Sequence, residues 1–168
     1  MLFRSYSVNP HVEIEGIATR LTDANAVTLL DNAAVVLDGT DSFATRFAIN
    51  TACHTLGVPL VSGAVGRWDG QVSVFASGMT KGRDLAERLP CYQCLVPEAP
   101  PQSEPCAATG IVGALTGVVG SMMALEAIKL LARSGKPLTG RVMVLDTLNA
   151  DTRTVRLRAD PECRCCGS

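Results

Sequence analysis

The sequence lacks an apolar stretch long enough to span a membrane, and it opens without a targeting segment. Its longest apolar run covers residues 111–125, is interrupted by glycines and stops at Glu126, whereas a bilayer-spanning helix needs about 18 apolar residues or more. The first residues do not contain the apolar segment of a signal peptide. These absences favour a soluble protein, and we expect a cytoplasmic location and no membrane partner.

An excess of positive charge is absent too. The 168 residues carry a formal net charge of −1, while nucleic-acid-binding proteins usually present a strongly basic patch. We therefore expect no nucleic-acid partner, although paired cysteine turns also occur in DNA-binding zinc ribbons. Hydrophobic residues make up 47% of the chain, and a chain of this length can bury roughly 70% of its extended surface. The composition predicts a single domain over residues 1–168.

The most informative feature that is present is a pair of Cys-x-x-Cys motifs. Cys91 and Cys94 form the first, and Cys163 and Cys166 form the second. A two-residue spacer lets one tight turn present two thiolates to a metal, and two such turns complete a tetrahedral Cys₄ site. Two disulfides or two redox-active pairs are the alternatives, but nothing in the sequence indicates an oxidising compartment. We expect these four cysteines to bind a structural Zn²⁺ ion, with Cys165 as a competing ligand.

Strand-like and helix-like segments alternate along the chain. Residues 33–37 are a continuous apolar run, typical of a parallel strand that is covered on both faces. Residues 42–56 have helical periodicity and end at Gly57. Further segments are a half-exposed strand at 71–75 after an Asp69-Gly70 turn, a long helix at 110–133, and strands at 60–61, 141–146 and 153–158. The order predicts an α/β fold with a mixed sheet, parallel first and antiparallel later.

Three glycines recur in the expected long helix, at Gly113, Gly117 and Gly120. Each would cost the helix about 1 kcal/mol if it had no function. Their near-regular spacing predicts a strip along which the helix packs closely on the sheet or on a partner.

Two acidic residues, Asp38 and Asp41, lie between the strand at 33–37 and the helix at 42–56. In open α/β sheets, ligands bind in the crevice outside the carboxyl ends of the strands. Two acids at that place can hold Mg²⁺ on a triphosphate. Alternatively, Ser42 or Asp41 caps the helix and Asp38 ends the strand. The local sequence leaves both interpretations open.

The segment Val-Val-Leu-Asp-Gly-Thr-Asp-Ser at residues 35–42 resembles the Asp-Cys-Thr-Asp-Asn segment of the ThiF/MoeB/HesA family, which is related to ubiquitin-activating enzymes. Gly39 stands where the family often has cysteine, and Ser42 where asparagine is usual. Further stretches resemble the family in the same order: residues 59–64, 70–72, 91–95, 124–131 and 160–167. The resemblance covers nearly the whole chain from residue 9 onward.

The resemblance implies activation of a ubiquitin-like sulfur carrier, similar to ThiS or MoaD, in thiamine or molybdopterin biosynthesis. ATP would adenylylate the carrier's carboxyl terminus, with ATP and Mg²⁺ as cofactors. Asp41 matches the family's Mg²⁺/ATP acid, and Ser42 lies beside it at the nucleotide. Cys106 falls where family members can carry a cysteine that binds the carrier covalently; a small buried or non-essential thiol is the alternative. Family members typically dimerise, so a homodimer is implied.

Several parts of the family pattern have no counterpart in this sequence. No Gly-x-Gly-x-x-Gly phosphate loop occurs near its amino end, and the family's adenine-ribose acid is missing as well. We therefore expect an incomplete Rossmann-like sheet, the carboxy-terminal portion of a ThiF-type domain. Two functions stay open: an ATP-dependent adenylyltransferase, or a catalytically inactive zinc module that binds a carrier or a full-length paralogue.

The helix at 42–56 also carries Arg46 and Asn50, which lie four residues apart on one face. They match positions of the family pattern. They could orient Asp41, or they could bond to each other and to the backbone, which we favour.

Overall fold

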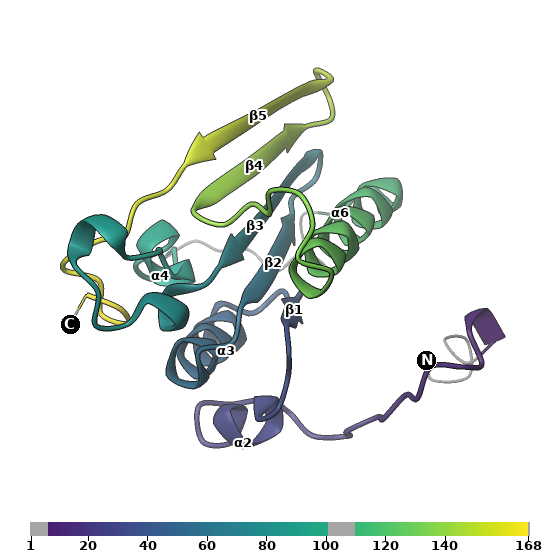
Figure 1. The fold of residues 1–168 in the computed structure, drawn as a ribbon. Coiled ribbons are helices and arrows are strands. Elements are labelled where there is room, and N and C mark those ends of the chain that lie inside the picture. The colour runs from purple at the N-terminus through teal and green to yellow at the C-terminus, as the bar shows by residue number, and fades with distance from the viewer. Residues whose placement is uncertain (1–6, 101–109, 168) are drawn as a thin grey trace.

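The computed structural model describes residues 7–100 and 110–167 and is built on a five-stranded sheet (Figure 1). The strands lie side by side in chain order: β1 (Val36–Asp38), β2 (Leu60–Val65), β3 (Asp69–Phe75), β4 (Arg141–Asp146) and β5 (Asp151–Arg156). β1 pairs with β2 in parallel, and every later pair is antiparallel. The prediction of an α/β fold with a mixed sheet is confirmed.

Two long helices cover opposite faces of this sheet. The described helices are α2 (Ala26–Leu30), α3 (Phe43–Leu56), α4 (Tyr92–Leu95) and α6 (Gly113–Leu131), with short 3₁₀ turns at Ser77–Thr80 and Leu85–Glu87. Ile49 of α3 packs in one core with Leu60, whereas Val119 of α6 packs in another with Val61. Since neighbouring residues of a strand point to opposite faces, α3 and α6 lie on opposite sides of β2.

The ends of α3 follow from local chemistry and agree with the sequence prediction. Ser42 is the N-cap residue, and its side chain accepts a hydrogen bond from the Thr45 amide at 3.5 Å. Gly57 ends the helix in the left-handed region at φ 71°, with its amide bonded to the Cys53 carbonyl. Glycine adopts this conformation without steric cost.

The half-exposed strand predicted at residues 71–75 is instead buried. β3 begins at Asp69, so the predicted turn at Asp69-Gly70 belongs to the strand. Ser73 is only 3% exposed, and its hydroxyl donates to the Arg141 carbonyl at 2.8 Å. The alternation of polar and apolar residues was misleading because the hydrogen bond allows the serine to be buried.

The sequence predicted that the glycines of α6 let this helix pack closely on the sheet or on a partner. In the structure, glycines of the sheet allow the close packing of helix on sheet instead. A Cβ atom on Gly113, Gly117 or Gly120 would meet nothing within 4 Å. A Cβ on Gly63 of β2 would overlap Met123, and one on Gly70 of β3 would lie 2.8 Å from Val119 Cγ2. The strand glycines therefore let α6 pack closely on β2 and β3.

α6 continues through Glu126, where the sequence suggested that the apolar run stops. The expectation that no stretch is long enough to span a membrane is therefore wrong, since the 19 residues of α6 are long and apolar enough by length and composition alone. However, α6 packs on β2 and β3 and buries Leu115, Val119 and Met123. These contacts identify α6 as a core helix whose other side remains exposed.

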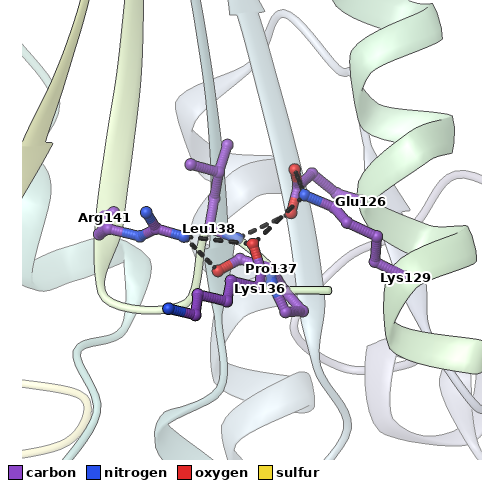
Figure 2. A network of polar contacts seen from close by, with 6 residues as sticks. All are labelled: Glu126, Lys129, Lys136, Pro137, Leu138 and Arg141. Atoms are coloured by element: carbon purple, nitrogen blue, oxygen red, sulfur yellow. Dashed lines mark hydrogen bonds and ion pairs between the residues drawn. The ribbon is translucent and has the colours of Figure 1, made fainter. Parts of the chain in front are cut away.

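Glu126 is buried because its carboxylate has two partners (Figure 2). It is 5% exposed, and its Oε2 atom accepts a hydrogen bond from the Leu138 amide at 2.7 Å. Its Oε1 atom forms an ion pair with Lys129, whose ammonium also donates to the Lys136 carbonyl at 3.4 Å. Arg141 donates to the carbonyls of Lys136 and Pro137 at 3.2 and 2.8 Å. This network joins α6 to the loop that leads into β4.

Replacing Glu126 with alanine is expected to lower the free energy of unfolding by about 1–3 kcal/mol, because the buried Leu138 amide loses its acceptor. Lys129→Gln is the matched control. It removes the ion pair but keeps the amide bond, and a partly exposed pair contributes at most about 1 kcal/mol. Urea denaturation of both variants measures the difference. Equal losses would show that the amide bond does not matter.

Candidate functional site

A cavity of about 500 Å³ opens at the carboxyl end of β1. Its wall is formed by loop residues 39–41, residues 63–65 of β2, and part of α6 with the residue Ile111 before it. Among the described residues that line the cavity, Asp41 is the only acidic residue and Arg46 is the only basic residue. The side chains of Val119 and Met123 make much of the remaining wall apolar. A polar loop facing an apolar wall is typical of a small-molecule site.

The loop after β1 is folded by Asp38, which points inward. Asp38 is 1% exposed, and its Oδ1 atom accepts hydrogen bonds from the Thr40 amide at 2.9 Å and the Thr40 hydroxyl at 2.8 Å. Asp38 does not line the cavity, whereas Asp41 is exposed and does. Of the two acids that the sequence offered for Mg²⁺, only Asp41 faces the cavity.

Arg46 holds the same loop from α3. Its Nε atom donates to the Thr40 carbonyl at 2.9 Å, its Nη2 atom donates to that carbonyl too, and Nη2 reaches the Gly63 carbonyl at 3.3 Å. The guanidinium thus joins the loop before Asp41 to β2. Arg46 therefore makes the backbone contacts that we favoured. Ser42, predicted at the nucleotide, caps α3 and is not part of the cavity lining.

The four predicted metal ligands come together beside α3, on the side that carries Asn50. The sulfur atoms of Cys91, Cys94, Cys163 and Cys166 all lie within 4.8 Å of one another. Cys91 is 4.0 Å from Cys94 and 3.5 Å from Cys163, and Cys94 is 3.4 Å from Cys166. A tetrahedral ion with metal–sulfur bonds near 2.3 Å separates its sulfurs by about 3.8 Å. A disulfide needs about 2.05 Å, and the six described cysteines are all free thiols. The donor set fits a metal ion.

Each cysteine pair is shaped by a tight turn. Cys91 precedes α4, and the Cys94 amide donates to its carbonyl at 3.1 Å. In the tail, the Gly167 amide donates to the Cys163 carbonyl at 2.9 Å. A Cβ on Gly167 would lie 2.5 Å from the Pro161 carbonyl oxygen, so only glycine fits at this position. The two turns are linked where the Asp160 amide donates to Cys94 Sγ at 3.4 Å.

Crowding of the thiols favours a cation between them. Hydrogen bonds from Cys165, Cys166 and Cys94 lower the pKa of the Cys91 thiol. The interaction with Cys91 in turn raises the pKa of Cys166 well above its ordinary value. One thiolate therefore opposes the ionisation of its neighbours, and a bound divalent cation would remove that opposition.

The contact of Asn50 with the cysteine turns was not predicted from the sequence. Asn50 is 2% exposed. Its Oδ1 atom accepts a hydrogen bond from the Tyr92 amide at 2.8 Å, and its Nδ2 atom donates to Cys165 Sγ at 3.3 Å. One carboxamide thus contacts both cysteine turns. The available signal was a polar side chain on the buried face of the helix.

Cys106 and Cys53 do not belong to the group of four cysteines whose sulfur atoms lie close together. Cys106, the possible covalent catalyst, lies outside the described residues. Cys53 is 3% exposed in the core under α3, where burial and then the negative charge of Asp38 raise the pKa of its thiol to about 12. Cys53 is therefore a core residue with an unreactive thiol.

The sequence matches the family model described as the ThiF family over residues 4–165. It is 43% identical over 166 residues to a sulfur carrier protein adenylyltransferase of Thermus thermophilus, covering 98% of this chain and 60% of that protein. It is 38% identical over 160 residues to a molybdopterin-synthase adenylyltransferase of Salmonella typhimurium, covering 95% of this chain and 61% of that protein. The chain thus spans about 60% of the length of these two curated relatives.

A solved structure shares the fold at low sequence identity. The crystal structure of E. coli MccB superposes with a TM-score of 0.76 and 13% identity, over 99% of this chain and 49% of that one. At this identity the likeness concerns the fold alone, and it agrees with the mixed sheet described above.

Proposed function

This chain belongs to the ThiF family, and from that premise we propose its function. We propose that it takes part in the ATP-dependent adenylylation of the carboxyl terminus of a ubiquitin-like sulfur-carrier protein. The names of its relatives support this activity, since both are adenylyltransferases, one for a sulfur carrier and one for molybdopterin synthase. The observation that carries it is the position of Asp41 in the cavity at the carboxyl end of β1.

The cavity residues suit this reaction. When bound, Mg²⁺ with ATP would neutralise phosphate charge as pyrophosphate leaves. Asp41 would hold the ion, because carboxylate oxygens are the ligands that Mg²⁺ prefers. Arg46 fixes the Thr40 carbonyl and so limits the movement of Asp41. The apolar side chains of Val119 and Met123 keep part of the wall dry, which strengthens charge interactions inside the site.

We further propose that the four-cysteine centre holds Zn²⁺ in a structural role. Four thiolates without an open position are typical of structural zinc sites. Bound by Cys91, Cys94, Cys163 and Cys166, the ion would join the tail to α4 and, through Asn50, to α3. It supplies stability and takes no part in the transfer of the adenylyl group.

The remaining parts of the proposal concern partners and location. The carrier would be similar to ThiS or MoaD, in thiamine or molybdopterin biosynthesis, and the protein would act in the cytoplasm as a homodimer.

Exposed apolar side chains on α6 support self-association, with Leu125 at 60%, Ile128 at 58% and Leu131 at 58% exposure. Sedimentation equilibrium measures the mass, and a monomer at micromolar concentration would contradict the dimer.

The test of the function is ATP–pyrophosphate exchange with purified ThiS-like and MoaD-like carriers. We expect exchange that depends on the carrier, because the carrier's terminal carboxylate attacks the α-phosphate. Exchange should be lost when the carboxyl-terminal glycine is deleted, because the shortened tail no longer brings its new terminal carboxylate to that phosphate. Binding of the carrier, measured by calorimetry, without any exchange would contradict adenylylation. That result would support a catalytically inactive zinc module instead.

A further inference from the structure

The first cysteine turn carries a large buried side chain, that of Tyr92. Tyr92 follows Cys91 and is 2% exposed. Its ring belongs to the core under α3 and not to the cysteine cluster. The centroid of this ring lies 5.9 Å from that of Phe47 on α3 and 5.7 Å from that of Phe75 on β3. The turn therefore places one aromatic ring between α3 and β3.

Hydrogen bonds fix the backbone of Tyr92 on both sides. Its amide donates to Asn50 Oδ1 at 2.8 Å, and its carbonyl accepts from the Val96 amide at 3.0 Å. Asn50 belongs to α3 and is 2% exposed, and a hydrogen bond in such a dry environment is stronger than one in water. The backbone of Tyr92 is therefore held at a set place beside α3.

The guanidinium of Arg46 lies over the ring of Tyr92, with Cζ 6.0 Å from the ring centroid. Arg46 is 8% exposed, and the attraction between a cation and an aromatic ring is stronger when both are removed from water. Burial raises the pKa of the Tyr92 phenol and the positive charge of Arg46 lowers it, in agreement with their proximity. Within the described part of the chain, Arg46 forms no ion pair with a carboxylate. Its charge is therefore balanced by the ring and by the carbonyl dipoles of Thr40 and Gly63.

We propose that Tyr92 is a positioning residue for the adenylylation proposed above, on which this inference rests: its ring holds the Arg46 guanidinium against the loop that carries Asp41. Arg46 bonds the carbonyl of Thr40, the residue before Asp41. Without the ring the guanidinium can move, and the loop loses its link to β2. A small misplacement of a reacting group lowers the rate strongly. Tyr92 does not line the cavity, so its effect on the reaction passes through Arg46.

The experiment compares Tyr92→Leu, which removes the ring, with Tyr92→Phe, which keeps it. Hydrogen–deuterium exchange with mass spectrometry reports on the loop at residues 39–41 and needs neither nucleotide nor carrier. We expect deuterium uptake by the peptide that contains this loop to be roughly tenfold faster in Tyr92→Leu and unchanged in Tyr92→Phe. In the ATP–pyrophosphate assay, kcat should fall roughly tenfold in Tyr92→Leu, with the KM for the carrier unchanged, and Tyr92→Phe should retain the wild-type kcat.

The matched control is Phe75→Leu, which truncates a neighbouring ring of the same core. It should lower the melting temperature, while loop uptake and kcat stay at wild-type values. Tyr92→Met is a second variant without a ring, and its long apolar side chain fills the space if Tyr92→Leu does not fold. It should show the same faster uptake as Tyr92→Leu.

Three results would overturn the inference. The first is wild-type uptake by the loop in the variants that lack the ring. The second is an equal increase in Phe75→Leu, which would mean that the whole core has loosened. The third is an equal increase in Tyr92→Phe, which would assign the contact to the hydroxyl. Faster loop uptake in Tyr92→Leu, together with no ATP–pyrophosphate exchange in the wild type, would refute the proposed function while the hold of the ring on the loop stands.

Discussion

Replacing Asp41 with asparagine is expected to lower carrier-dependent ATP–pyrophosphate exchange by roughly 100-fold or more, the scale of removing one charge-stabilising group from an active site. Asparagine has nearly the same size but cannot supply the negative charge that holds Mg²⁺. Asp41 is exposed at the cavity and caps no helix, since Ser42 is the N-cap of α3. The loss of exchange should therefore come without a loss of stability.

The matched control is Asp151→Asn, an exposed acid on β5, at the opposite edge of the sheet from β1. It changes the net charge by the same amount, and its exchange should equal that of the wild type. Thermal unfolding of both variants checks the fold. Wild-type exchange in Asp41→Asn would remove Asp41 from the mechanism. A lowered melting temperature in that variant would instead indicate a structural role.

Removing the metal is expected to have the largest effect on stability. Structural zinc contributes about 10–16 kcal/mol of binding free energy in small zinc-finger peptides, and we expect several kcal/mol of this to appear as lost stability here. Cys91→Ser should abolish zinc binding, because Cys91 is fully buried and its sulfur contacts those of Cys94 and Cys163. Metal analysis of the reduced protein and denaturant unfolding with and without a chelator measure both effects.

Cys165→Ser is the control for this experiment, because it changes a thiol in the same tail that is not one of the four ligands. It should retain one zinc ion per chain and stay sensitive to the chelator. If Cys165→Ser loses zinc while Cys163→Ser retains it, Cys165 is a ligand and the assignment of the second pair is wrong. Zinc absent from the reduced wild type would refute the site altogether.

The sequence predicted those features whose causes are local. The bounds of α3 depend on the Ser42 cap and on the left-handed conformation of Gly57, and both can be read from neighbouring residues. β4 occupies the predicted residues 141–146. The four cysteines were identified from their spacing, because a turn of two intervening residues brings two thiols together without any distant contact.

Other features depend on contacts that no local pattern encodes. The local residue pattern does not distinguish Asp38 from Asp41, although the family resemblance pointed to Asp41. The folded loop, in which Asp38 bonds to Thr40, separates the inward acid from the one that faces the cavity. Likewise, glycines in α6 suggested a packing strip, but close approach occurs at Gly63 and Gly70 of the sheet. A glycine's role depends on what lies opposite it.

By itself, the amino-acid sequence determined the class of fold, the family resemblance and the four cysteines proposed as ligands, since these follow from periodicity and caps, from motifs in a matching order, and from the spacing of the cysteines. The tertiary structure alone decided that the two cysteine pairs meet, that Asp41 opens onto a cavity, and that Asn50 holds Cys165 beside Cys91. The physical reason is distance along the chain. Residues more than a hundred positions apart, such as Asn50 and Cys165, become neighbours only when α3, the sheet and the tail have packed together.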